Sequence, residues 1–238
     1  MPFSTTGLMM YYYNIMKFTR TIVMWWKQLI EFCQNLLVPE STKVQKLLRL
    51  DPNLLRDLLP KSPVYSKDIF VLFDYQNQVV RLIVKSIKYK NNANLRKRIA
   101  LYLYEEMMEL SSEIALFEGS PPLLVPMPMS QKEKRERGFN QCEELVKEIK
   151  KIGGENIIVS YNTLKKVRET RRQTTLSKEE RKENVKDSMM AGPLPRAGHL
   201  PTVIVLDDVY TTGASLDEAR RALLDAGAHR IIGLFIAH

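Results

Sequence analysis

"VIVLDDVYTTGAS", residues 203–215, joins a run of four apolar residues to two adjacent acids and then to a loop of small and hydroxyl residues. Because residues 203–206 are apolar without alternation, they are typical of a strand that is buried on both faces. Such strands occur in parallel sheets covered by helices, where ligands bind at the carboxyl ends of the strands. The stretch therefore predicts an α/β fold with Asp207 and Asp208 at a ligand site.

The segments around this stretch alternate between strand-like and helix-like patterns from residue 121 onward, which favours a parallel sheet. We expect strands at 121–130, 156–164, 203–206 and 230–237, and helices at 77–89, 94–117, 141–152, 177–185 and 215–226. Asn94 is suited to cap the long helix, and Ser177 with Glu180 forms a capping box for another. Residues 75–238 are therefore expected to form one α/β domain.

Residues 1–74 form a separate predicted region. Apolar residues from Ile15 to Leu36 recur at spacings of three and four, which predicts an amphipathic helix. Charged residues such as Lys17 interrupt the apolar run, so it does not resemble a transmembrane span. Two placements stay open for this helix: docking on the body of the protein, or lying on a membrane surface. Residues 39–75 contain four prolines and are expected to be irregular apart from a short helical patch.

The composition narrows the class of protein. The chain has 238 residues, of which 45% are hydrophobic and 26% charged, so it can bury a sizeable core and is not disordered by composition. Cys33 and Cys142 are the only cysteines, too few for a disulfide scaffold or a four-cysteine zinc site, and we expect a cytoplasmic location. The net charge of +9 predicts an anionic partner, either a small phosphate ligand or a nucleic acid.

The residues after the two acids suit a phosphate group. A helix that begins near Ser215 directs its unpaired amides back at the preceding loop, where Thr211 and Thr212 add hydroxyl donors and Gly213 permits close approach. The two acids would repel a phosphate, but they suit a diol, or Mg²⁺ bound directly or through water. A phosphate, a diol and a metal within a short distance describe a ribose 5-phosphate ligand.

The alternative is a plain strand-to-helix turn with a Ser215–Glu218 capping box, but that leaves two acids at the end of a buried strand unexplained. The stretch also resembles the phosphoribosyl pyrophosphate (PRPP) motif of type I phosphoribosyltransferases. The resemblance implies that Asp207 and Asp208 contact the ribose hydroxyls and that the loop wraps the 5-phosphate. The residues that match the loop are Thr211, Thr212, Gly213, Ala214 and Ser215.

Three further segments resemble the ComF family, which is linked to competence and DNA uptake. They are "LIVKSIKYKNN" (82–92), "LLVPMPMSQKEKRERGFNQCEELVKEI" (123–149) and "RETRRQTTLSKEERKENVKDS" (168–188). The likeness covers about residues 75–238 and implies a type I phosphoribosyltransferase-like fold, with PRPP and Mg²⁺ as ligands and with Met129 and Ser130 in the pyrophosphate-binding turn. Many members also carry an N-terminal zinc ribbon, but its cysteine pairs are absent here, so we expect no zinc.

A basic stretch, residues 131–141, follows the predicted strand at 121–130. Expulsion of pyrophosphate from the ribose needs cations that meet the growing charge of the leaving group, so Lys132, Arg135 and Arg137 are the candidate catalytic residues. A basic loop could also close over the ligand and exclude water. The alternative is a solvated helix start with Asn140 as its cap.

Two weaker signals complete the list. A second basic cluster at residues 165–172 could contact a second substrate, bind DNA or face solvent, and no aromatic residues interleave with it as in single-strand binding platforms. Cys142 lies on the apolar stripe of the helix expected at 141–152, which favours a core position over a nucleophile.

Three functions stay open on the sequence. The first is a phosphoribosyltransferase that transfers the phosphoribosyl group of PRPP, bound with Mg²⁺, to an acceptor that the sequence does not name. The second is a non-catalytic PRPP sensor that acts through a protein partner. The third is a competence accessory protein whose basic surface touches single-stranded DNA or the DNA-uptake machinery.

Overall fold

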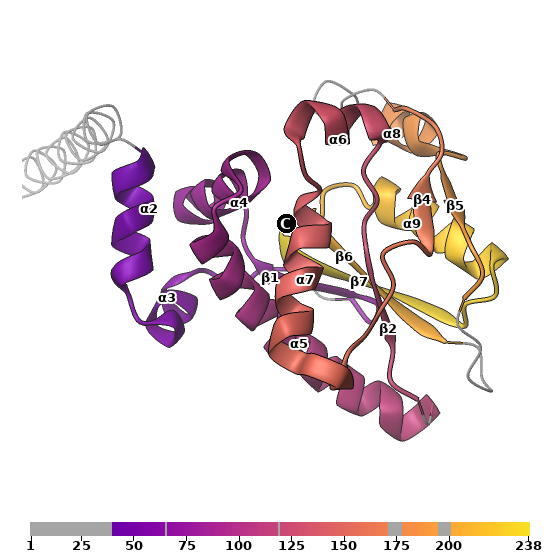
Figure 1. Cartoon of the computed structure of the whole chain (residues 1–238), viewed down its shortest axis with the longest axis horizontal. Coiled ribbons are helices and arrows are strands. Elements are labelled where there is room, and N and C mark those ends of the chain that lie inside the picture. The colour runs from indigo at the N-terminus through magenta and orange to yellow at the C-terminus, as the bar shows by residue number, and fades with distance from the viewer. Residues whose placement is uncertain (1–39, 65, 119, 171–177, 195–200) are drawn as a thin grey trace, which may run out of the picture. The chain divides into compact units, whose positions relative to one another are not determined.

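The computed structural model describes residues 40–64, 66–118, 120–170, 178–194 and 201–238 (Figure 1). The chain divides into two compact units, residues 1–49 and residues 50–238. In the first unit the structure describes helix α2 (Glu40–Arg49). The amphipathic helix expected between Ile15 and Leu36 and the capping role expected of Ser177 both lie outside the described residues.

A five-stranded parallel sheet forms the centre of the second unit (Figure 1). Its strands, in spatial order, are β1 (Ile69–Phe73), β7 (Arg230–Ala237), β6 (Thr202–Val209), β2 (Leu123–Pro126) and β3 (Ile158–Val159). Val203 to Leu206 of the central strand are each 0% exposed, because neighbouring strands and helices cover both faces. The predicted parallel α/β fold, with a doubly buried strand at 203–206, is therefore confirmed.

Helices cover this sheet. Helices α4 (Gln78–Lys90), α5 (Ala93–Glu118) and α7 (Gln141–Gly153) pack on one another and on the central strands, while α9 (Ala214–Asp225) packs on β7. The apolar residues of α4 and α7 recur with helical spacing, and the side chains that they bury make the core with the sheet. Among the residues that the structure describes, none of the helices combines the length and the apolar character that a bilayer crossing requires.

The strand expected at 156–164 is two strands in two different sheets. β3 ends at Val159, and β4 (Leu164–Lys166) pairs with β5 (Met189–Ala191) in a small antiparallel sheet, with α8 (Lys178–Val185) between them in the chain. The polar residues between the two strands form a turn, in which the Thr163 hydroxyl donates to the Ser160 hydroxyl at 2.7 Å. Turn-forming side chains therefore outweigh the β propensity of the flanking residues.

The segment expected to be irregular, residues 39–75, contains regular structure. The helical patch expected near residues 43–50 is helix α2, and the segment also holds a short helix α3 (Pro52–Leu58) and the edge strand β1, which pairs with β7. The five apolar residues of β1 lie between Asp68 and Asp74, and burial against β7 stabilises them as a strand despite the prolines nearby. The division expected at 74/75 thus falls directly after a strand of the central sheet.

Two predicted helix caps are also corrected. Helix α5 begins at Ala93, so Asn92 rather than Asn94 caps it, and the Asn92 Oδ1 accepts the Leu95 amide at 3.0 Å. Helix α9 has Gly213 at its N-cap and no side-chain cap, so the Ser215–Glu218 capping box does not form. The Glu218 carboxylate instead accepts the Met189 amide, because Glu218 is buried beneath β5.

Candidate functional site

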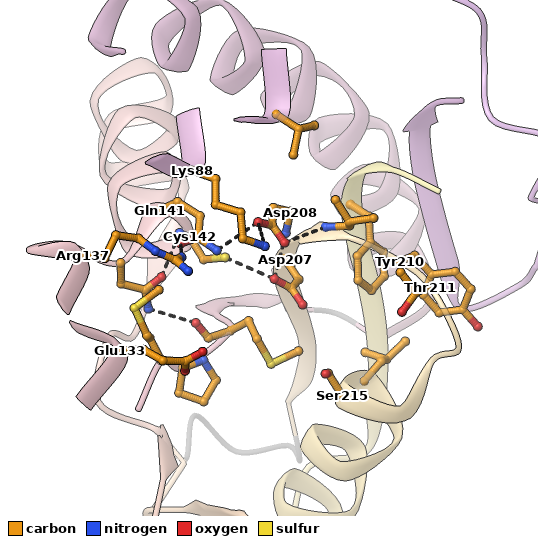
Figure 2. A pocket seen from close by; sticks show the side chains of 18 of the residues that line it. Lys88, Glu133, Arg137, Gln141, Cys142, Asp207, Asp208, Tyr210, Thr211 and Ser215 are labelled. Carbon is orange, nitrogen blue, oxygen red and sulfur yellow. Dashed lines mark hydrogen bonds and ion pairs between the residues drawn. The ribbon is translucent and has the colours of Figure 1, made fainter. Parts of the chain in front are cut away.

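A cavity of about 840 Å³ opens at the carboxyl ends of β2 and β6 (Figure 2). Its lining comes from these strand ends, from α4, from the segment between β2 and α7, and from the loop that leads into α9. The predicted ligand residues that line it are Met129, Arg137, Asp207, Asp208, Thr211, Gly213, Ala214 and Ser215. Segments far apart in the sequence thus meet where ligands bind to parallel sheets.

Asp208 is held by three donors. Its Oδ2 lies 2.8 Å from the Lys88 ammonium and accepts the Gln141 Nε2 amide at 3.0 Å, while its Oδ1 accepts the Val209 amide at 2.9 Å (Figure 2). The residue is 5% exposed. Both carboxylate oxygens of Asp208 therefore have protein partners before any ligand arrives.

Asp207 is half-buried and has different partners. Its Oδ1 accepts the Asp208 amide at 2.8 Å and lies 3.4 Å from the Cys142 thiol (Figure 2). Gln141 and Cys142 occupy the first turn of α7, so two consecutive helix residues contact two consecutive acids. The amide end of that helix, capped by Asn140 as predicted, favours the negative charge beside it.

The ionisation of this cluster follows from burial and charge. Burial and the neighbouring Asp208 charge raise the pKa of Asp207 to about 7. Burial lowers the pKa of Lys88, but the charge and hydrogen bond of Asp208 outweigh it, so the pKa is raised overall. Burial, together with both acids, raises the pKa of the Cys142 thiol well above its usual value. Cys142 is therefore a neutral core thiol, as the apolar stripe predicted, and is unsuited to act as a nucleophile.

The loop between β6 and α9 has the features of an anion site. Gly213 adopts a φ of +80°, and a Cβ there would lie 2.9 Å from the Tyr210 hydroxyl, so glycine is needed in this turn. Ser215 and the exposed Thr211 line the cavity, as Figure 2 shows. The Thr212 hydroxyl oxygen is buried, and within the described residues it has no hydrogen-bond partner. A buried hydroxyl without a partner is costly. Thr212, unlike Thr211 and Ser215, is not among the residues that line the cavity.

The basic stretch is a helix and not a loop. Helix α6 (Gln131–Arg137) begins with a capping box formed by Ser130 and Glu133, and it ends at Gly138, whose φ is +86°. The capping box fixes where the helix begins and Gly138 fixes where it ends, which explains why this stretch of mixed charges is helical. The Ser130 hydroxyl accepts the Glu133 amide, so Ser130 shapes the turn that was expected to bind pyrophosphate.

The three predicted cations of this stretch are placed differently. Arg137 lines the cavity, whereas Lys132 and Arg135 are exposed and lie outside its lining. The Arg137 guanidinium donates to Gln141 Oε1 at 2.5 Å and lies 5.4 Å from the centre of the Tyr89 ring. Gln141 therefore joins Arg137 on one side to Asp208 on the other.

The second basic cluster divides as well. Lys166 lines the cavity and pairs with Glu133 at 3.6 Å, while Arg168 donates to the carbonyls of Asn184 and Lys186. Residues 171–177 lie outside the described part of the chain. Lys166 thus adds a cation to the cavity, and Arg168 stabilises the backbone around β5.

Lys88 and Gln141 are site residues that the sequence reasoning missed. A signal for Lys88 was present, since Val80, Val84 and Lys88 recur every four residues and place a charge in a buried row of α4. Lys88 also lies in the segment 82–92 that resembles the ComF family, although no role had been assigned to it. Gln141 follows the Asn140 cap, and its amide reaches Asp208 only because α7 packs beside β6.

No family model matches the chain. Competence protein F of Haemophilus influenzae is 24% identical over 167 residues, covering 70% of this chain and 71% of that protein. Competence protein ComFC of Bacillus subtilis is 26% identical over 59% of this chain and 63% of its own length. The DNA utilization protein YhgH of Salmonella typhi is 29% identical over 71% of each chain.

Two solved structures that are similar to this chain are described as phosphoribosyltransferases. A hypoxanthine phosphoribosyltransferase from Staphylococcus aureus shares 12% identity with a TM-score of 0.31, over 57% of this chain and 62% of that one. The L. donovani hypoxanthine-guanine phosphoribosyl transferase shares 7% identity with a TM-score of 0.35, over 59% and 71%. The competence proteins among the relatives confirm the resemblance to the ComF family that the sequence motifs predicted.

Proposed function

We propose that this ComF-like protein binds PRPP, or another ribose 5-phosphate ligand, in the cavity and transfers the phosphoribosyl group to a nucleophile. The observation that carries the proposal is one cavity lined both by the two acids near the carboxyl end of β6 and by the amide end of α9. A diol and a phosphate are the two ends of a ribose 5-phosphate, and the cavity offers a group suited to each.

The phosphate end is supported by the loop before α9. The first turn of a helix carries unpaired amides and a partial positive charge, and Gly213 lets a phosphate approach them. The Thr212 hydroxyl is buried outside the cavity lining and has no partner in the described part of the chain, so it would donate to a phosphate oxygen only if the turn shifted on binding. Thr211, Ala214 and Ser215 line the cavity around this position and would complete the cradle.

The diol end is supported by Asp207. Asp208 already accepts from three donors, whereas Asp207 uses its Oδ1 for the Asp208 amide and the Cys142 thiol. The Asp207 Oδ2 is therefore the carboxylate oxygen best placed to accept from a ribose hydroxyl. Asp208 would act by holding this region of the strand end in place.

The predicted Mg²⁺ fits only part of this arrangement. Within the described residues, no group of three or more His, Cys, Asp or Glu side chains is arranged to hold a metal ion. A site that uses both acids directly does not fit, since the oxygens of Asp208 are engaged by Lys88, Gln141 and the Val209 amide. Asp207, directly or through water, would be the protein contact of a Mg²⁺ that enters with PRPP and neutralises its pyrophosphate.

In the transfer step the protein would position the two reactants and supply positive charge to the leaving pyrophosphate. The nucleophile forms a bond to the ribose C1, the bond from C1 to the pyrophosphate oxygen breaks, and the leaving group takes the electron pair. Arg137 and Lys166 line the cavity and would neutralise that growing charge, beside the turn that holds Met129 and Ser130. Lys132 and Arg135 would act on the ligand only if α6 moved toward the cavity.

Two measurements on the full chain test the proposal. Calorimetry should show PRPP binding in the presence of Mg²⁺, and the Asp207→Asn, Asp208→Asn double variant should lose most of that affinity. Release of pyrophosphate with a panel of acceptors then separates a transferase from a PRPP sensor, which binds without release. If PRPP affinity is unchanged in the double variant, the cavity is not the PRPP site and the proposal fails.

A link to DNA uptake is the second candidate function, and the names of the relatives favour it. Two of them are called competence proteins and a third a DNA utilization protein, and this chain carries a net charge of +9. Single-stranded DNA would then bind to the basic surface with an affinity that falls steeply with salt. Neutralising Asp207 and Asp208 should leave that affinity unchanged or raise it, which is the opposite of the effect expected for PRPP.

A further inference from the structure

Lys88 brings a positive charge to the floor of the cavity. Its side chain is 27% exposed, and its ammonium lies 2.8 Å from Asp208 Oδ2, where Figure 2 shows it pointing at the acid. It continues the buried row of Val80 and Val84 on α4, so the helix packing fixes its position. Because an ion pair at this depth is only partly screened by water, the two charges are strongly coupled.

The ion pair between Lys88 and Asp208 limits how the two acids can bind a divalent cation. Two adjacent carboxylates with exposed oxygens would form a dianionic pair, the kind of group that prefers a divalent cation. Here the ammonium compensates Asp208, and Gln141 Nε2 and the Val209 amide occupy the rest of its carboxylate. A metal ion at Asp208 would have to displace Lys88 or share its space against charge repulsion.

We infer that Lys88 is the built-in cation of this site: it positions and neutralises Asp208, so that Asp207 alone presents a carboxylate to the ligand and its metal. For the identity of the ligand the inference rests on the proposed function. Lys88 acts through Asp208 and is therefore a positioning residue. The ion pair therefore makes the two neighbouring acids unequal: Asp207 contacts the ligand, whereas Asp208 does not, although the sequence motif suggests the same role for both.

The first test needs no ligand. The full-length protein is titrated with Mn²⁺ at pH 8, above the raised pKa of about 7 of Asp207, and binding is followed by paramagnetic broadening and calorimetry. Lys88→Met exposes an uncompensated acid pair and should bind Mn²⁺ about tenfold more tightly than wild type, since affinity follows ligand charge. Lys88→Met with Asp208→Asn should return to the wild-type value, and Lys90→Met, on the same helix outside the cavity lining, should not change it.

Lys88→Arg keeps the charge and should retain the weak Mn²⁺ binding of wild type. If Lys88→Met does not fold, the Mn²⁺ affinity of Lys88→Arg is the measurement that tests the inference. Unchanged Mn²⁺ affinity in a folded Lys88→Met variant, or tighter binding in Lys88→Arg, would overturn the inference.

The second test compares the two acids with ribose 5-phosphate as the probe, in the presence of Mg²⁺. Asp207→Asn should weaken binding by about tenfold or more, the size expected for a lost hydrogen bond to a charged group. Asp208→Asn should change it by less than about threefold, because Asp208 makes no direct ligand contact. Equal losses in the two variants would overturn the inference while leaving the proposed function intact. If wild type binds neither ribose 5-phosphate nor PRPP, the proposed function fails, and the Mn²⁺ titration still decides the role of Lys88.

Discussion

At the residue scale, the two arginines of α6 are chemically alike but placed differently. Arg137 lines the cavity and bonds Gln141, whereas Arg135 is exposed outside the lining. We expect Arg137→Ala to lower turnover by about 10²-fold, the usual effect of removing a preorganised group that meets developing charge. Arg135→Ala should have a much smaller effect. The rate of pyrophosphate release measures both, and equal losses would show that α6 moves during the reaction.

Glu218 gives a pH-dependent prediction, since it is buried and does not serve as a helix cap. Burial raises its pKa, but the hydrogen bonds of Arg221 and of the Met189 amide outweigh burial, so the pKa is lowered overall. A lowered folded-state pKa means that Glu218 stabilises the fold above its unfolded pKa of about 4.3, and that this contribution is lost as the pH falls further.

Glu218→Gln should therefore lower the free energy of unfolding by roughly 1–2 kcal/mol at pH 7. The difference from wild type should shrink as the pH falls from about 4 through the lowered folded-state pKa of Glu218, because below it Glu218 is protonated in both the folded and the unfolded state. Urea denaturation at both pH values measures this. Asp225→Asn is the matched control, since Asp225 pairs with the same Arg221 but is 67% exposed and contributes little. If Glu218→Gln differs from wild type by the same free energy of unfolding at both pH values, the ionised Glu218 carboxylate is not the group that stabilises the fold.

At the element scale, the turn between β6 and α9 depends on Gly213. Its φ of +80° disfavours any residue with a Cβ, and the added atom would lie 2.9 Å from the Tyr210 hydroxyl. We expect Gly213→Ala to cost about 1 kcal/mol of stability and to weaken ribose 5-phosphate binding by about tenfold or more, because the loop amides shift. Gly154→Ala is the control, with a φ of +55° at the far end of α7 and no atoms in the way. Equal ligand affinity in the two variants would show that the turn does not hold the phosphate.

At the scale of the whole molecule, a ligand that bridges β6, α7 and α9 should stabilise the fold. Mass action gives about 2.7 kcal/mol at a ligand concentration one hundred times the dissociation constant. We expect millimolar PRPP with Mg²⁺ to raise the melting temperature, and pyrophosphate alone to raise it less. A melting temperature that PRPP does not move would argue against both a transferase and a PRPP sensor.

The metal content of the whole chain is a further prediction. The cysteine pairs of a zinc ribbon are absent from the sequence, so purified protein should carry no stoichiometric zinc. Elemental analysis measures this directly. About one zinc per chain would require ligands other than cysteine pairs.

The sequence by itself determined the class of the fold and the local chemistry of the loop. Residues 203–206 are four consecutive apolar residues, the pattern typical of a strand buried on both faces, and they lie in β6, which also contains Asp207 and Asp208 and leads to the turn at Gly213. These features lie within one short stretch, where spacing along the chain also fixes spacing in space. Helices α4 and α7 were predictable for the same reason, since their apolar periodicity is local.

Only the tertiary structure decided which side chains meet the two acids. Lys88 and Gln141 reach Asp208 because α4 and α7 pack on the sheet, and no local pattern reports that encounter. The same holds for β1, whose pairing with β7 outweighs the prolines around it. Packing of distant segments decides which charges are compensated, and a buried carboxylate offers a ligand only the oxygens that its neighbours leave open.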